Sequence, residues 1–129
     1  MEDAEEFLLH CDARVLDPAP VLALFNGNVA DYLEILDAAL EDLPRLRARW
    51  LDDVARGDKE RLEVSLHELA GTLGAASSVA AQVAARALED DLRASRVLPD
   101  NLRERVACVT EQIDAFEAAA RHLLLARPC

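Results

Sequence analysis

Apolar side chains recur at intervals of three and four residues along most of this 129-residue chain, and this spacing constrains the fold more than any other feature. An α-helix turns by about 100° per residue, so the spacing places these side chains on one side of a helix. No segment shows the apolar–polar alternation that a half-buried strand requires. With only 4 Gly and 5 Pro, and much alanine, leucine, arginine and glutamate, the sequence predicts an all-α protein.

The longest apolar stripe predicts one long helix in the first half of the chain. Asn28 suits the N-cap before it, and Gly57 suits the position just after its end. Pro44 lies inside the run, and we expect a kink there rather than a break, because the stripe continues in phase beyond it. The stripe consists of Val29, Tyr32, Leu33, Leu36, Leu40, Leu43, Leu46, Trp50 and Val54.

Three further stripes predict the remaining long helices. The second helix runs from about Asp58 to Ala76, and Pro99-Asp100 marks the start of the last one. A short helix begins at Asp17-Pro18 and ends at the turn signal Asn26-Gly27-Asn28. The stripes are Leu62, Leu66, Leu69 and Leu73 in the second helix, Val79, Val83, Ala87, Leu88 and Leu92 in the third, and Leu102, Val106, Val109, Ile113, Phe116, Ala120 and Leu123 in the last.

Short connections place consecutive helices antiparallel. The sequence therefore predicts an all-α, up-and-down antiparallel four-helix bundle with a short extra N-terminal helix. We assign residues 1–14 to an N-terminal lead-in and residues 15–127 to the bundle, which is large enough for one modest core. We expect a small acidic bundle of this kind to be a monomer.

The formal net charge of −11 argues against two classes of partner. An acidic surface repels the phosphates of nucleic acids, and it repels anionic membranes for the same reason. No apolar run approaches the ~20 residues of a membrane-spanning helix, and the acidic N-terminus is unlike a secretory signal. Three scattered cysteines fit reduced thiols better than a disulfide framework, so we expect a cytoplasmic protein.

His67 lies on a different side of its predicted helix from the leucines, together with Gly71, Gly74 and Ser78. A glycine inside a helix costs ~1 kcal/mol relative to alanine, and this face carries two. Missing side chains beside an exposed imidazole would open the approach for a bulky partner. The alternative is that the glycines allow close packing of a neighbouring helix, but the leucine stripe places them away from one.

Other site chemistries have less support in the sequence. A metal site in a bundle needs inward-facing Glu-x-x-His pairs on several helices, and no such pair recurs along the chain. Ser65 and Cys108 lack the accompanying histidine and orienting carboxylate of a nucleophilic site. We expect the charge runs Glu41-Asp42 and Glu89-Asp90-Asp91 to be solvated faces.

The segment His67-Glu68-Leu69-Ala70-Gly71 resembles the His-x-Leu-Lys-Gly signature of histidine-containing phosphotransfer (HPt) domains. The resemblance covers roughly residues 15–125, and the ordered set of matches is more specific than any one of them. The other matching segments are Leu24-Phe25-Asn26-Gly27-Asn28, Leu43-Pro44, Gly57-Asp58 and Leu88-Glu89.

The resemblance implies a four-helix bundle in which His67 is the phosphoacceptor, and Gly71 keeps the approach to it open. Such domains carry a phosphoryl group between aspartates of response-regulator receiver domains, or receive it from a hybrid histidine kinase, and have no kinase activity of their own. They bind no cofactor, because the partner receiver domain supplies Mg²⁺. Docking would use apolar and small residues around the histidine, among them Val64, Gly74 and Ser78.

Two positions depart from the family pattern. The usual lysine three residues after the histidine is Ala70 here, which removes a local cation. Lys59 is the nearest lysine in sequence and the candidate substitute. The glycine that commonly lies ten residues after the histidine is Ser77, and Gly74 is the candidate to take its role.

Two rival functions remain. The first is an HPt-like bundle that is never phosphorylated and binds a receiver or kinase as an inhibitor or scaffold, which the missing lysine favours. The second is an unrelated metal- or cofactor-binding bundle, which requires His67 to face inward.

Overall fold

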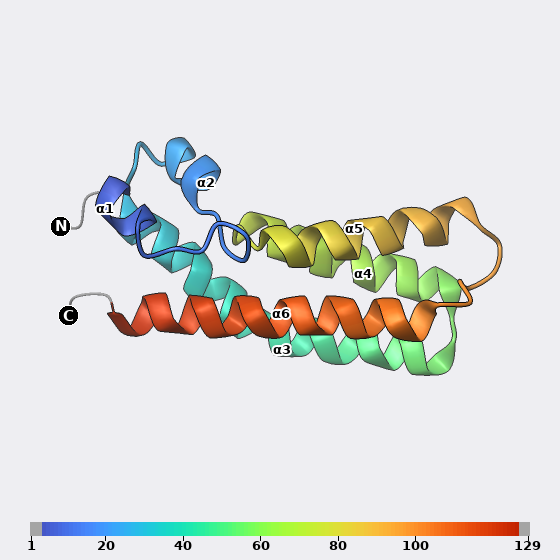
Figure 1. Cartoon of the computed structure of the whole chain (residues 1–129). Coiled ribbons are helices and arrows are strands. Elements are labelled where there is room, and N and C mark those ends of the chain that lie inside the picture. The colour runs from blue at the N-terminus through green and yellow to red at the C-terminus, as the bar shows by residue number, and fades with distance from the viewer. Residues whose placement is uncertain (1–3, 127–129) are drawn as a thin grey trace.

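Four long helices lie side by side in the computed structural model, which describes residues 4–126, apart from the side chain of Ala126 (Figure 1). Each packs against the next along the chain, and the last closes the ring against the first, so the fold is an antiparallel four-helix bundle. Two short helices precede it at one end. The helices are α1 (Ala4–Leu8), α2 (Ala19–Leu24), α3 (Val29–Arg56), α4 (Lys59–Ala75), α5 (Val79–Ala94) and α6 (Leu102–Ala126).

The expected capping residues define the ends of α3 and α4. Asn28 Oδ1 accepts a hydrogen bond of 3.2 Å from the backbone N–H of Asp31, which caps the start of α3. Gly57 ends that helix in the left-handed conformation at a φ of 66°, which glycine adopts without steric cost. Asp58 Oδ1 then caps α4 through the N–H of Arg61, also at 3.2 Å. The caps fix where α4 begins, and thus the phase at which it presents His67.

The predicted stripe of α3 is buried from Val29 to Trp50, whereas Val54 is only partly covered, and α3 continues through Pro44 without a break. Its largest side chains, Tyr32 and Trp50, are fully buried. The leucines of α4 and the predicted stripe of α6 face the same core, although Leu102 and Val106 are only partly covered. The periodicity therefore located the core faces of these three helices correctly.

The predicted stripe of α5 is correct at Leu88 and Leu92, which are fully buried, and wrong at its other three positions. Val79 and Val83 are 38% and 62% exposed, and Ala87 is also exposed. The buried face of α5 consists of Ala81, Ala85, Leu88 and Leu92, with the carboxylate of Glu89 beside them. Two of these buried residues are alanines, whose small side chains let neighbouring helices approach closely, whereas the larger Val79 and Val83 lie on the outer face.

The N-terminal residues belong to the same core. Phe7 of α1 is 3% exposed, and its ring packs edge-on against Tyr32 with the ring centroids 6.0 Å apart. Leu8 is partly covered, whereas Leu9 is 84% exposed. Helix α2 begins at Ala19, one residue after the expected start, and Ala19 N–H donates to Asp17 Oδ1. The lead-in thus contains a helix that the sequence did not predict.

One buried hydrogen bond ties α3 to the end of α4. The Tyr32 hydroxyl donates to the backbone oxygen of Ala76 at 3.0 Å. Burial raises the pKa of Tyr32 above its ordinary value, so the hydroxyl keeps its proton and remains a donor. The adjoining Ser77 has a φ of 69°, the left-handed conformation that turns the chain from α4 into α5.

We expect the substitution Tyr32→Phe to lower the free energy of unfolding by about 1 kcal/mol, because it leaves the buried carbonyl of Ala76 without its donor. Urea unfolding followed by circular dichroism measures this change. An unchanged midpoint at an unchanged slope would show that the hydrogen bond contributes nothing to stability.

Candidate functional site

Helix α4 presents His67 to solvent while its leucines form part of the core. The imidazole is 59% exposed, whereas Leu62, Leu66 and Leu69 are fully buried. The helical wheel placed the histidine correctly. A metal-binding bundle in the form considered above would need this side chain to face inward, and it does not.

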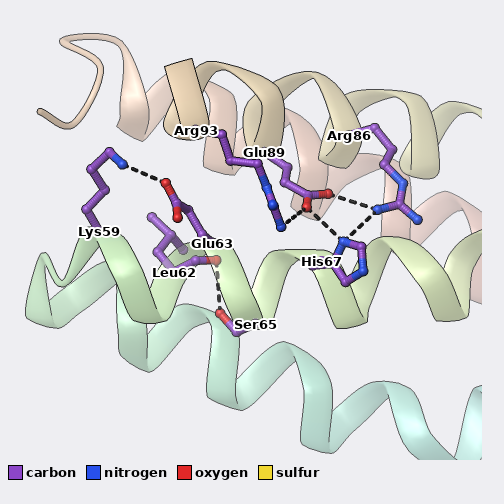
Figure 2. A network of polar contacts seen from close by, with 8 residues as sticks. All are labelled: Lys59, Leu62, Glu63, Ser65, His67, Arg86, Glu89 and Arg93. Carbon is purple, nitrogen blue, oxygen red and sulfur yellow. Dashed lines mark hydrogen bonds and ion pairs between the residues drawn. The ribbon is translucent and has the colours of Figure 1, made fainter. Parts of the chain in front are cut away.

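A buried carboxylate on the neighbouring helix holds the imidazole. Glu89 of α5 places Oε2 at 2.8 Å from His67 Nδ1, and its side chain is only 4% exposed (Figure 2). Two arginines from the same helix also contact Glu89: Arg86 Nη1 donates to Oε1 at 2.9 Å, and Arg93 Nη2 lies 2.7 Å from Oε2. Arg86 Nη1 is also 3.0 Å from His67 Nδ1. We call these four residues the Glu89 cluster.

The Glu89 cluster keeps its carboxylate ionised. Burial by itself raises the pKa of Glu89. The hydrogen bonds from Arg86 and His67 and the charges of His67 and Arg93 lower the pKa by more than burial raises it, so it lies below its ordinary value. An ionised carboxylate only accepts hydrogen bonds, so Nδ1 binds Glu89 when Nδ1 carries the proton. In that tautomer Nε2 keeps its lone pair, on a side chain that is more than half exposed.

An open groove of about 420 Å³ lies beside the histidine, between α3 and α4. Asp42 and Arg45 of α3 form an ion pair at its edge, and Arg49 of α3 pairs with Glu68 of α4 at 3.0 Å. The groove is lined by Asp42, Arg45, Leu46, His67, Glu68, Gly71, Thr72 and Ala75. A partner that reaches His67 therefore meets charged groups that are already paired.

The two glycines of the predicted open face have different surroundings. A Cβ built on Gly71 has no atom within 4 Å, so the space one turn beyond His67 is open, as predicted. A Cβ on Gly74 would lie 2.9 Å from Cδ of Gln82 on α5, and closer still to its amide nitrogen. The prediction that both glycines face away from other helices is therefore wrong for Gly74, which makes room for a side chain of α5.

Three other predicted site residues lie apart from the imidazole. Ser78 is 1% exposed at the N-cap position of α5, so its expected place on the open face is wrong, because the turn at Ser77 ends α4 first. Lys59 binds Glu63 at 2.6 Å and is not the cation next to His67 (Figure 2). Ala70 is fully buried.

Val64 lies one turn before His67 on α4 and is 52% exposed. It is an exposed apolar side chain near the imidazole, as expected for a docking residue.

The sequence did not predict the three residues of α5 that belong to the Glu89 cluster. The expectation that Glu89 is part of a solvated charge run is wrong, because Glu89 is buried. A signal was present: Glu89 follows Ala85 by four residues and precedes Leu92 by three, so it lies within the buried stripe. Arg86 and Arg93 lie three residues before and four residues after it, within reach of its side chain.

The part of the chain that the structure describes contains no assembled metal site and no assembled nucleophilic site. Residues 4–126 contain no group of three or more His, Cys, Asp or Glu side chains that could hold a metal ion. The Ser65 hydroxyl is buried and donates to the backbone oxygen of Leu62, and Cys108 is exposed on α6. None of the described helices is long and apolar enough to cross a membrane.

A comparison with solved structures identifies the fold. The HPT domain from the "Hpt Sensor Hybrid Histidine Kinase" of Shewanella matches with a TM-score of 0.74 and 20% sequence identity, over 92% of this chain and 100% of that chain. No protein-family model and no curated protein matches the sequence. The chain therefore has an HPt-like fold, a helical bundle, as the sequence resemblance predicted.

Because the pKa of Glu89 is lowered, the free energy of unfolding should depend on pH in the acid range. Because the folded-state pKa lies below the ordinary value of 4.5, the ionised carboxylate stabilises the fold above that pH, and this contribution is lost as the pH falls through the folded-state pKa. We expect Glu89→Gln to destabilise the protein at neutral pH and the difference from wild type to shrink below about pH 4. Urea unfolding at several pH values measures it. A difference that is independent of pH would contradict the ionised state of Glu89.

Proposed function

We propose that this chain is a histidine phosphotransfer protein that accepts a phosphoryl group on His67 and passes it on. The observation that carries the proposal is a solvent-facing imidazole whose Nδ1 is bound to a buried carboxylate, on an HPt-like fold. The proposed donors and acceptors are aspartates of response-regulator receiver domains, some of them in hybrid histidine kinases.

The site supplies a nucleophile rather than the whole reaction. In the proposed step, the lone pair of Nε2 attacks phosphorus, the P–O bond to the partner's aspartate breaks, and the aspartate leaves as a carboxylate. The Nδ1 proton stays on the ring, which becomes positively charged, and the adjacent carboxylate of Glu89 stabilises that charge. The reverse step returns the phosphoryl group to an aspartate. Mg²⁺ belongs to the partner, whose acidic pocket would bind it.

The surface around His67 suits the approach of another protein. The space above Gly71 is open, the groove between α3 and α4 opens beside the imidazole, and Val64 offers an exposed apolar contact. We propose this surface as the docking site for a receiver domain, with the ion pair of Arg49 and Glu68 at its edge.

Phosphotransfer from a panel of phosphorylated receiver domains, with Mg²⁺, tests the proposal. We expect wild type to acquire an acid-labile, base-stable label, and His67→Gln to acquire none, because glutamine has no nucleophilic nitrogen. His10→Gln and His122→Gln are matched controls, since both of these histidines are exposed, and each should be labelled like wild type. Label on His67→Gln would show that another residue accepts the phosphoryl group.

Access to the imidazole is tested by Gly71→Leu. The added side chain meets no atom near its Cβ in the folded chain, so the fold should tolerate it while it blocks an approaching partner. We expect the transfer rate to fall by roughly ten- to hundredfold, because small displacements of reacting groups carry costs of that order. Ala118→Leu, at an exposed position on α6, should leave the rate unchanged. An equal rate in Gly71→Leu and wild type would contradict the docking surface.

A scaffold that binds a receiver without phosphorylation is the second candidate. The alanine at position 70, where the family pattern has lysine, favours it. Receiver binding by wild type without label from any donor in the panel would support this function over phosphotransfer.

A further inference from the structure

We propose that Arg86 is a positioning residue that sets the tautomer of His67 by competing with Glu89 for Nδ1, and so restrains phosphoryl acceptance. The competition follows from the two contacts that Nδ1 makes with Glu89 and Arg86. Its effect on the transfer rate rests on the proposed function.

The two contacts of Nδ1 cannot both be hydrogen bonds of a neutral imidazole. Glu89 Oε2, at 2.8 Å, is an acceptor and requires a proton on Nδ1. Arg86 Nη1, at 3.0 Å, is a donor and requires a lone pair on Nδ1. The neutral ring carries one proton, so each contact selects a different tautomer. When Glu89 is bound, Nε2 keeps its lone pair; when Arg86 is bound, the proton is on Nε2.

Arg86 is held where it can compete. The same Nη1 donates to Glu89 Oε1 at 2.9 Å, so the guanidinium lies beside both the carboxylate and the ring (Figure 2). Its side chain is 37% exposed, against 4% for Glu89. Arg93 contacts Glu89 Oε2 at 2.7 Å but makes no hydrogen bond to His67 in the described structure. The two arginines bind different oxygens of Glu89, and of the two only Arg86 contacts the imidazole.

Six charged side chains of α3 and α4 form ion pairs of their own. Lys59 binds Glu63 on α4, and Arg49 of α3 binds Glu68. Asp42 and Arg45, on the α3 side of the groove, pair with each other at 3.5 Å. None of these groups contacts Nδ1 in the described structure, so the choice of tautomer depends on the Glu89 cluster.

The tautomer determines whether His67 can accept a phosphoryl group. Nε2 needs its lone pair to form the N–P bond, and with a proton on Nε2 that lone pair is absent. The acceptance rate is then proportional to the fraction of the ring that has its proton on Nδ1. Arg86 lowers this fraction, and a partner that draws the guanidinium towards an incoming phosphoryl group would raise it.

Nitrogen NMR of the imidazole tests the competition directly. Wild type, Arg86→Met and Arg93→Met are labelled with ¹⁵N in histidine, and the Nδ1 and Nε2 shifts of His67 are followed across a pH titration that identifies the neutral ring. Both variants remove one cation from Glu89 and keep a side chain of similar length, but only Arg86→Met removes the donor to Nδ1. We expect the proton to move towards Nδ1 in Arg86→Met and to move clearly less in Arg93→Met, which changes the charge around Glu89 but keeps the donor to Nδ1.

Three results would overturn the proposal: wild-type shifts in Arg86→Met, equal changes in both variants, or a change towards protonated Nε2 in Arg86→Met. Equal changes would mean that Arg86 acts only through the charge of Glu89. Thermal unfolding of the three proteins shows whether each is folded. Arg86→Ala serves if methionine disturbs the packing of α5.

The rate of acceptance is measured on the same three proteins with a phosphorylated receiver domain. We expect Arg86→Met to exceed Arg93→Met by the factor by which its Nδ1–H fraction is larger, on the order of two- to tenfold. A rate that falls as this fraction rises would overturn the restraint. If the tautomer shifts as expected but no protein, wild type included, accepts a label, the proposed function fails and the control of the tautomer stands.

Discussion

The buried carboxylate of Glu89 is the interaction on which the site depends. An ionised carboxylate with 4% of its side chain exposed costs several kcal/mol of desolvation unless charged partners and hydrogen bonds offset it. Arg86 and Arg93 supply the charges from the same helix, and His67 supplies the third contact from the helix opposite. The contact with the imidazole therefore offsets part of the free-energy cost of burying Glu89. The geometry of the exposed histidine and the stability of α4 against α5 are coupled through one side chain.

Close packing of α4 and α5 is what lets this contact form. Ala70 on α4 and Ala81 and Ala85 on α5 are essentially fully buried, and these two helices share the most extensive contact in the bundle. Small side chains at these positions bring the backbones near enough for Glu89 to reach across. The close packing continues one turn further at Gly74, where the side chain of Gln82 occupies the space that a Cβ on residue 74 would fill. The missing side chains beside His67 thus serve two purposes: Gly71 opens the surface, and Gly74 accommodates α5.

Sequence periodicity was sufficient where the buried side chains are large. The caps at Asn28 and Asp58 and the stripes of α3, α4 and α6 are as predicted, because leucines and aromatic residues dominate the burial of those helices. In α5 two of the five buried residues are alanines, which carry little hydrophobic signal, so the larger Val79 and Val83 indicated the wrong face for the first half of the helix. That error placed Glu89 on a solvated face. A helical wheel also assumes that the helix continues. The turn at Ser77 ends α4 before Ser78, so Ser78 does not share the face of His67.

Local charge at the site differs from the charge of the protein as a whole. The chain carries a net charge of −11, which opposes the approach of a phosphorylated partner. Around His67, however, Glu63 and Glu68 are each neutralised by a basic partner, and Glu89 has two arginines to its one negative charge. With a neutral imidazole, the Glu89 cluster thus carries one net positive charge within an acidic molecule. A phosphoryl group on His67 would lie near this positive charge. The arginines of α5 would thus supply the cation that is missing at position 70, where the chain has alanine.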